Sequence, residues 1–377
     1  MAEIRSDIDV VLECVKCQLK SPTALHQSLM TLSGLFSSDE AKDYVRESGG
    51  LLYLYDLLRR TDFPNIKIAT LFCLASATEK NVFSQTLLTQ HGVFRVIHDS
   101  LHSVISSDKL RQAAVFLLLC LVANNSQSQN EARESGCLAD LMGMFRYSSY
   151  GTQKLVSSGS SVITEARQFG LVTSALSVSI NNPQNEENQR LCSTLLPHIF
   201  SLVMRVSEPQ ALCPVLSLVG VMVANNVFNQ DRVKKCGGLD TLGSLLCNLS
   251  NRSTEEDCLT TAVQVVGALD SCLTDNEVNI NKLGEVCGFG PLFSLLTPGL
   301  LSQQEQLQVV VTLSHVLQDN SGALAGVSAE NYQQLVCLLT QAQDEELVKA
   351  LKYVLHIIQD SECDKQTAQP EVKPNLK

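Results

Sequence analysis

VMVANNVFNQDRVKKCGGLDTLGSLLCNL, residues 221–249, contains the boundaries of one repeating unit. It reads as the end of a buried helix (VMVANN), a short amphipathic helix (NQDRVKKC), a break at Gly237 and Gly238, and a second apolar helix (LDTLGSLL). Glycine ends helices readily because it adopts left-handed backbone at little cost. The stretch therefore predicts helices joined by a tight glycine turn.

The same order of features recurs along the chain. It appears as AKDYVRESGGLLYLYDLL near Gly50, SQTLLTQHGVFRVIHDSL near Gly92, QNEARESGCLADLMGMF near Gly136 and NINKLGEVCGFGPLFSLL near Gly288. In each case a polar loop and a long apolar helix come next, and that helix finishes at an asparagine. Self-similarity of this kind predicts a stack of helical repeats, each burying its apolar face against its neighbours.

The closing asparagines set the length of the repeat. They are separated by steps of 44, 57, 44, 50 and 44 residues, in the range of about 40 to 47 residues that is typical of HEAT and armadillo units. We interpret them as residues that end the long helix in the left-handed conformation. The closing asparagines are Asn81, Asn125, Asn182, Asn226, Asn276 and Asn320.

The step of 57 residues contains extra sequence, RYSSYGTQKLVSSGSS at 146–161. Its serines and glycines have no apolar period, so we expect an exposed, mobile loop between helices. A neutral insertion is the simpler explanation, because insertions concentrate in surface loops. A partner-binding or phosphorylated loop is the alternative.

The predicted domain organisation is one repeat domain over residues 1–360, followed by a disordered tail or the start of a linker at 361–377. The first segment, IDVVLECVKCQLK at 8–20, places apolar residues at helical spacing and suits a helix that covers the start of the stack. The last segment is polar, with two prolines and no apolar period.

Composition limits the possible functions of the 377-residue chain. It is 45% hydrophobic with no tryptophan, as expected for a soluble protein built from aliphatic helices. The net charge of -11 argues against direct binding to nucleic acid and favours a partner with a basic or amphipathic segment. The N-terminus carries charges within its apolar run, and AAVFLLLCLVA at 113–123 is too short to cross a bilayer, so we expect no secretory signal and no membrane insertion.

The 14 cysteines lie mostly at apolar helix positions, such as Cys73, Cys120, Cys192 and Cys272. Cysteine at such positions behaves as a small hydrophobic residue, which favours an intracellular, reducing compartment.

Two patterns resemble ligand pairs. Cys14 and Cys17 form a CxxC, but neither a second CxxC nor a nearby histidine completes four ligands, so helix packing is the better interpretation. His98 and His102 stand four residues apart without an HExxH pattern, and Asp99 between them points to the side, so a solvated helix face is favoured. With no catalytic constellation in the sequence, we expect no enzyme activity, no cofactor and no metal.

The order of short helix, glycine turn, second helix and long helix resembles the armadillo repeat. RESGGLLYLYDLL, RESGCLADLMGMF, KKCGGLDTLGSLL and the long helix IKIATLFCLASATEKN carry this resemblance. It implies an all-α, right-handed superhelical solenoid of about seven armadillo-like repeats and a non-catalytic role in protein interaction.

Peptide-binding armadillo proteins hold an extended peptide with a ladder of asparagines on their long helices. We expect this ladder to be absent here, which leaves room for a helix or a folded partner in the groove. By our alignment the corresponding positions are Cys73, Cys120, Val221, Ser271 and His315.

A narrower resemblance is carried by IDVVLECVKCQLK, VRESGGL, ASATEKN, EELVKALKYVLH and, most specifically, INNPQNEENQ. These segments resemble the armadillo region of the bouquet formation proteins, meiotic proteins that help attach telomeres to the inner nuclear membrane and move chromosomes for homologue pairing. The resemblance implies a scaffold in the nucleus, at telomeres and the nuclear inner membrane. It also implies partners in the meiotic telomere complex, the nuclear-envelope bridge and cohesin.

Two alternatives stay open. A general armadillo adaptor would bind a peptide or helix in its concave groove without any tie to meiotic chromosomes, and an enzyme would show a convergent polar pocket. Bouquet proteins carry further segments and a Myb-like domain after the repeats, so we expect this chain to represent either the repeat region alone or a short form. The sequence assigns no partner-binding residues and no oligomeric state.

Overall fold

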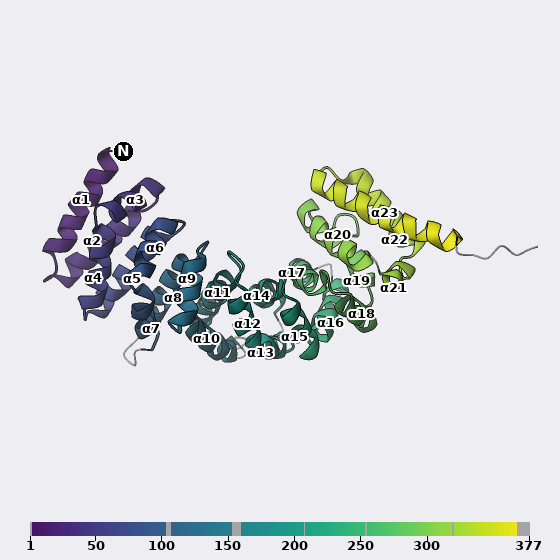
Figure 1. The fold of residues 1–377 in the computed structure, drawn as a ribbon, viewed down its shortest axis with the longest axis horizontal. Coiled ribbons are helices and arrows are strands. Elements are labelled where there is room, and N and C mark those ends of the chain that lie inside the picture. Colours follow the sequence, from purple (N-terminus) through teal and green to yellow (C-terminus); the bar gives the residue numbers. More distant parts are fainter. Residues whose placement is uncertain are drawn as a thin grey trace, which may run out of the picture. The chain divides into compact units, whose positions relative to one another are not determined.

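The computed structural model describes residues 2–102, 107–152, 160–206, 208–252, 255–318 and 320–367. The chain divides into two compact units, Met1–Leu195 (unit 1) and Leu196–Lys377 (unit 2). The described residues are helical apart from turns, short connections and one isolated bridge between Asn181 and Gln184 (Figure 1). The helices explain how each unit is built.

Unit 1 contains twelve α-helices and a 3-10 turn at Ser193–Leu195 among its described residues. The helices are α1 (Ala2–Cys17), α2 (Pro22–Leu35), α3 (Asp39–Glu47), α4 (Gly50–Arg60), α5 (Pro64–Thr78), α6 (Val82–Gln90), α7 (Val93–His102), α8 (Asp108–Val122), α9 (Ser126–Glu134), α10 (Cys137–Thr152), α11 (Ser160–Ile180) and α12 (Glu186–Cys192).

Unit 2 contains the remaining helices and a 3-10 turn at Pro209–Leu212. The helices are α13 (Leu196–Val203), α14 (Cys213–Val223), α15 (Val227–Lys235), α16 (Gly238–Ser250), α17 (Glu256–Leu273), α18 (Glu277–Cys287), α19 (Gly290–Leu295), α20 (Gln303–Leu317), α21 (Ser321–Ala325), α22 (Ala329–Gln341) and α23 (Glu345–Thr367).

The helices form sets of three that follow the predicted repeat. After the pair α1 and α2, seven sets run from α3–α5 to α21–α23 across the described ranges, and the fourth set begins with α12 in unit 1 and continues with α13 and α14 in unit 2. The predicted all-α solenoid of armadillo-like repeats is confirmed.

The third helix of each set is the long one, and within each unit these helices pack against one another. In unit 1 they are α5, α8 and α11, with α2 of the first pair packed against α5, and in unit 2 they are α14, α17, α20 and α23. Their inward side chains, such as Leu71, Val266 and Leu313, are fully buried. Burying one such side chain contributes roughly 1.5–3 kcal/mol, so this row of helices contributes substantially to the stability of each unit.

The glycine turns lie where the sequence predicted them. Gly237 has φ +74, in the left-handed region, and the other turns use glycines with φ between +65 and +89. Gly238 follows with a different constraint, because a Cβ atom there would overlap the ring of Phe200 and lie 2.7 Å from Val233 Cγ1. One glycine thus allows the turn and the next allows close packing.

The closing asparagines have a different role from the one expected. Asn226 has φ -137, and its side chain accepts a hydrogen bond from the backbone N–H of Asn229, which makes it the N-cap of α15. The left-handed position is the residue before it, Asn225, with φ 50. The interpretation of these asparagines as left-handed helix ends is therefore wrong. The residues that cap the next short helix in this way are Asn81, Asn125, Asn226, Asn276 and Asn320.

The third closing asparagine was also misplaced. Asn182 precedes Pro183 in a cis peptide, whereas Asn185 caps α12 and accepts from the N–H of Asn188. The NEENQ half of INNPQNEENQ is therefore an ordinary cap segment of the repeat, equivalent to NVFNQ at 226–230. Only the INNPQ half departs from the repeat pattern.

In α6, α9 and α15 a buried glutamine four residues after the cap connects the first helix of the set to the end of its long helix and to the cap of the next set, and sequence reasoning missed it. The Nε2 of Gln85 donates to the backbone carbonyls of Cys120 and Ala123 at 2.8 and 3.1 Å, at the end of the following long helix. Its Oε1 accepts from the next cap, Asn125, at 3.2 Å. The last carbonyls of a helix have no partner within the helix, so a buried end needs such donors.

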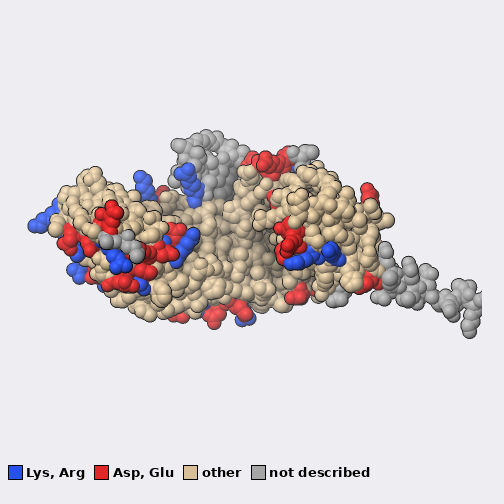
Figure 2. Space-filling model, turned by 90° about the horizontal axis from the view of Figure 1, so that it is seen from above, with Lys and Arg blue, Asp and Glu red and all other residues tan. Residues whose placement is uncertain are grey.

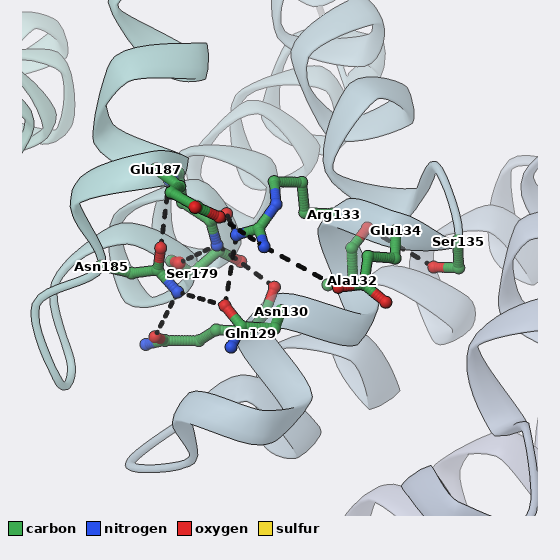
Figure 3. Close-up of polar contacts among 10 residues, drawn as sticks. Gln129, Asn130, Ala132, Arg133, Glu134, Ser135, Ser179, Asn185 and Glu187 are labelled. Carbon is green, nitrogen blue, oxygen red and sulfur yellow. Dashed lines mark hydrogen bonds and ion pairs between the residues drawn. The ribbon is translucent and has the colours of Figure 1, made fainter.

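The same connection recurs in both units. Gln129 donates to the carbonyls of Val178 and Pro183 at 2.9 and 3.0 Å, and Asn185 donates to its Oε1 at 3.4 Å. Figure 3 shows this junction, where Arg133 also reaches across to Glu187 at 2.7 Å.

In unit 2, Gln230 donates to the carbonyls of Ser271 and Thr274 at 3.0 and 3.1 Å and accepts from Asn276 at 3.0 Å. Lys42 takes the equivalent place in the first set and donates to the carbonyl of Glu79 at 2.6 Å. We call Gln85, Gln129 and Gln230 the clamp glutamines.

The expected loop at 146–161 is helical at both of its ends. Helix α10 continues to Thr152 and α11 begins at Ser160, so most of this segment is helical, and residues 153–159 lie outside the described residues. The prediction of a loop is wrong for the helical part. At the other end α23 continues to Thr367, past the expected boundary at 360, and residues 368–377 of the expected tail lie outside the described residues.

A clamp glutamine should contribute far more to stability than an exposed one on the same helix. Gln129→Ala leaves buried carbonyls of the next long helix without a donor, so we expect the free energy of unfolding to fall by about 1–3 kcal/mol in urea titrations followed by circular dichroism. Gln127→Ala on the exposed side of α9 is the control and should change it by less than about 0.5 kcal/mol. An equal fall in the unfolding free energy of the two variants would show that the clamp hydrogen bonds contribute no more to stability than an exposed glutamine does.

Substitution of Gly238 and of Gly267 by alanine should change the stability of the fold in opposite directions. Gly238→Ala forces the Phe200 ring to move, and overpacking of this kind costs about 1–3 kcal/mol. Gly267→Ala adds a Cβ to a helix interior with nothing within 4 Å, and should stabilise by about 0.5–1 kcal/mol. Thermal unfolding of the two variants measures both signs.

Candidate protein interface

The long helices of unit 1 expose an apolar strip. Ile68 and Phe72 on α5 lie one turn apart, so they share a helix face, and they are half-buried while Leu71 and Leu74 beside them are fully buried. On α8, Phe116 and Leu119 are half-buried in the same way.

The two aromatic rings of this strip are in contact. The ring centroids of Phe72 and Phe116 lie 5.8 Å apart with a tilt of 45°, an arrangement typical of favourable aromatic pairs. We call Ile68, Phe72, Phe116 and Leu119 the aromatic face. Because both rings keep part of their surface in solvent, a partner could cover them and gain apolar burial.

The long helices of unit 2 expose polar side chains instead. Ser217 on α14 donates to Gln264 on α17 at 3.0 Å, and the Nδ1 of His315 on α20 lies 2.8 Å from the Oδ1 of Asp270 on α17. Both contacts join neighbouring repeats at the surface. The aromatic pair on α5 and α8 of unit 1 thus contrasts with these polar contacts on α14, α17 and α20 of unit 2.

The groove positions predicted by alignment are only partly exposed. Cys73 and Cys120 are buried in the core of unit 1, while Val221, Ser271 and His315 are half-buried in unit 2. In unit 1 the outward positions are one residue earlier, at Phe72 and Leu119. None of the five aligned positions is an asparagine, and two of them lie in the core, so they form no peptide-binding ladder.

The first turns of the short helices carry exposed apolar residues two positions after the cap. Phe83 is 70% exposed, Phe228 55% and Val278 58%. The cap residue sets where each short helix begins, and the residue two positions after it faces solvent in all three helices. We call Phe228 and Val278, on the neighbouring helices α15 and α18, the cap edge of unit 2.

Charge is gathered into groups on the surface. In the view of Figure 2 acidic and basic side chains lie beside one another in several groups, with broad uncharged areas between the groups. Acidic residues outnumber basic ones by 39 to 28 over the whole chain. A partner with a basic segment therefore meets a favourable field on approach.

The histidine pair lies against an acid that the sequence reasoning did not connect with it. His98 Nδ1 lies 2.7 Å from Asp140 Oδ2, and His102 Nε2 lies 3.4 Å from Asp140 Oδ1. The interpretation as a solvated helix face alone is wrong, because Asp140 comes from α10 in the next repeat. The repeat period places the start of α10 beside α7, and this is the signal that could have found it.

The cysteines fit their expected role in packing. Cys73, Cys120, Cys192 and Cys272 are buried, as predicted. Burial raises the pKa of the Cys120 and Cys192 thiols to about 12, so they stay protonated and unreactive at neutral pH. Among the cysteines that the structure describes, all are free thiols.

Cys14 and Cys17 lie half-buried and exposed on α1. Within the described ranges they belong to no group of three metal-ligating side chains. Over the same ranges no helix has the length and apolar character needed to span a membrane.

His315 should make stability depend on pH. Its hydrogen bond to Asp270 raises the pKa of the imidazole, against a smaller opposing effect of burial. A pKa that is higher in the folded state stabilises the fold while His315 is protonated, and this contribution is lost as the pH rises through the folded pKa. We expect the difference in unfolding free energy between the protein and His315→Gln to shrink between about pH 6 and pH 8. A difference that stays constant or grows over this range would contradict it.

Solved structures of other proteins support the armadillo-like fold. The designed armadillo repeat protein YIII(Dq)4CqI superposes with a TM-score of 0.55 and 17% identity, over 70% of this chain and 99% of that one. A second designed armadillo protein, solved in complex with the peptide (KR)4, gives a TM-score of 0.52 at 18% identity over 68% of this chain. No family model matches the sequence.

Curated relatives cover nearly all of the chain. Telomere repeats-binding bouquet formation protein 1 of Homo sapiens is 31% identical over 360 residues, which is 94% of this chain and 49% of the relative. The protein of the same name from Danio rerio is 32% identical over 364 residues, 94% of this chain and 43% of the relative. The chain thus spans about half the length of the curated relatives it matches. The resemblance predicted from short segments is confirmed: this chain is an armadillo-like repeat protein similar along almost all of its length to telomere repeats-binding bouquet formation protein 1.

Proposed function

We propose that this chain is a non-catalytic interaction scaffold that acts in meiosis, where it helps to attach telomeres to the inner nuclear membrane for chromosome movement and homologue pairing. The observation that carries the proposal is the match of 94% of the chain to relatives named for telomere binding and bouquet formation. The repeat fold is compatible with it, since stacked helical repeats present extended surfaces to partners.

The aromatic face is the surface that best fits a partner. Two half-buried phenylalanines in contact form a rigid apolar centre, and aromatic residues are the usual anchors of interfaces. An amphipathic helix that lays its apolar side on a groove is a common mode of recognition by helical proteins. With the acidic balance of the chain, the matching segment would carry basic residues beside its apolar stripe.

The partners proposed on this basis are proteins of the meiotic telomere complex, the nuclear-envelope bridge and cohesin. Nuclear location, at telomeres and the inner membrane, would follow from these contacts, since none of the described helices is suited to crossing a bilayer. Direct contact with DNA is not part of the proposal, because the net charge of -11 opposes binding to phosphate.

The test is a pull-down from meiotic testis extract with this chain as bait, followed by mass spectrometry. We expect nuclear-envelope bridge or cohesin components to be recovered, and recovery to fall at least about tenfold for the double variant Phe72→Ala, Phe116→Ala, because two interface anchors typically contribute more than about 1 kcal/mol each. Circular dichroism must show that the variant is folded at the temperature used.

A matched variant on the other surface locates the contact. Phe228→Ala removes an exposed ring from the cap edge and should leave recovery unchanged if the aromatic face binds the partner. The opposite result would move the interface to the cap edge. Recovery of cytosolic proteins only would replace the meiotic proposal with that of a general armadillo adaptor.

A further inference from the structure

Three side chains that could ligate a metal meet at the junction of the second and third repeats. His98 and His102 lie in the last two turns of α7, and Asp140 lies in the first turn of α10. One ligand atom from each of the three lies within 4.8 Å of the others, and this is the one such group among the residues that the structure describes. The carboxylate is 11% exposed, and the imidazoles are 36% and 60% exposed.

The orientation of His102 is the observation that points to a cation. Its Nδ1 lies 3.3 Å from the backbone carbonyl of His98, and a carbonyl can only accept, so this contact places the ring hydrogen on Nδ1. In the neutral imidazole the other nitrogen, Nε2, then presents a lone pair toward Asp140 Oδ1 at 3.4 Å. Two acceptors that face each other need a positive charge between or on them.

The pair of His98 with Asp140 does not by itself explain this arrangement. An acid in the first turn of a helix is stabilised by the helix dipole and could simply accept a hydrogen bond from one imidazole. Asp140, however, directs its second oxygen to a second imidazole, and the bond of His102 Nδ1 to a carbonyl is the contact that typically orients a metal-ligating histidine.

The surrounding packing holds the site in place. The ring of His98 rests against the turn at Gly136, where a Cβ atom would lie 3.4 Å from its Cε1. Beside it the thiol of Cys137 donates to the carbonyl of Phe94 at 3.2 Å, which joins α10 to α7. Both helices are therefore fixed to each other before any ion binds, so little ordering is needed on binding.

We propose that His98, His102 and Asp140 bind one divalent transition-metal ion, for which Zn²⁺ is the best match, with water completing the coordination. Bonds of about 2.0–2.1 Å in a tetrahedral site place ligand atoms about 3.3 Å apart, close to the present separation of His102 and Asp140. The contact of His98 with Asp140, at 2.7 Å, opens by a fraction of an ångström to admit the ion. Two imidazoles and one carboxylate form a donor set typical of zinc.

The ion would link the second helices of two consecutive repeats, α7 and α10. It stabilises the folded state by mass action, because the three ligands come together only when the repeats are stacked. This effect is independent of any meiotic partner and of the aromatic face, which lies on the long helices.

Co²⁺ titration of the full chain tests the site. We expect one Co²⁺ per chain, visible as the d–d absorption of a low-coordinate site without a thiolate charge-transfer band, and displaced by Zn²⁺. Because imidazole must be deprotonated to bind, affinity should fall as the pH is lowered below about 6. Zn²⁺ should also raise the unfolding temperature.

Single substitutions separate this site from other binding. Asp140→Asn keeps the shape and a hydrogen bond to His98 but removes the charge, and His102→Ala removes one ligand, so each should weaken Co²⁺ binding at least about tenfold. Asp99→Asn, on the exposed side of the same turn, removes the same charge and should change nothing. Retained binding in Asp140→Asn and His102→Ala, or a thiolate charge-transfer band in the Co²⁺ spectrum, would overturn the proposal.

Discussion

The buried ends of the long helices are the constraint on which the rest of the structure depends. Each long helix finishes inside the stack, where its last carbonyls cannot reach water. The clamp glutamines provide the missing donors from the first short helix of the same set, and the cap asparagine of the next set donates a hydrogen bond back to the same side-chain amide. One residue per junction therefore satisfies a helix end, a cap and a repeat contact together.

Much of the fold follows from the sequence because its signals are local. Glycines at the turns and the apolar run of each long helix predicted the repeat, its approximate length and its packing, and the structure places Gly237 and the buried cysteines as expected. The role of the asparagines was misread for a physical reason. Asparagine suits both a left-handed helix end and an N-cap, and only the backbone angle of Asn226 separates the two.

Features that depend on contacts between repeats were not predictable in the same way. The pattern of asparagine followed four residues later by glutamine is visible in NVFSQ, NSQSQ, NEENQ and NVFNQ, but its meaning requires knowing which carbonyls lie next to it. Asp140 is likewise 42 residues from His98, and Phe72 is 44 residues from Phe116. Each pair is one repeat apart, so the period, rather than any local motif, brings the residues together.

The clamp glutamine is not present in every repeat. Its glutamine lies on the first helix of a set and reaches the end of the third helix of the same set, but at the equivalent position α18 has Ile280 and α21 has Leu324, which offer no amide to that helix end. Asn320, the cap of α21, donates to Asn281 on α18 instead. The last two repeats of unit 2 therefore lack this clamp and use other contacts, such as the hydrogen bond from Gln334 to the carbonyl of Phe293 at 2.9 Å. Local unfolding that separates helices from the stack would begin in these repeats. It would stop at Gln230, the first clamp glutamine in the direction of the N-terminus.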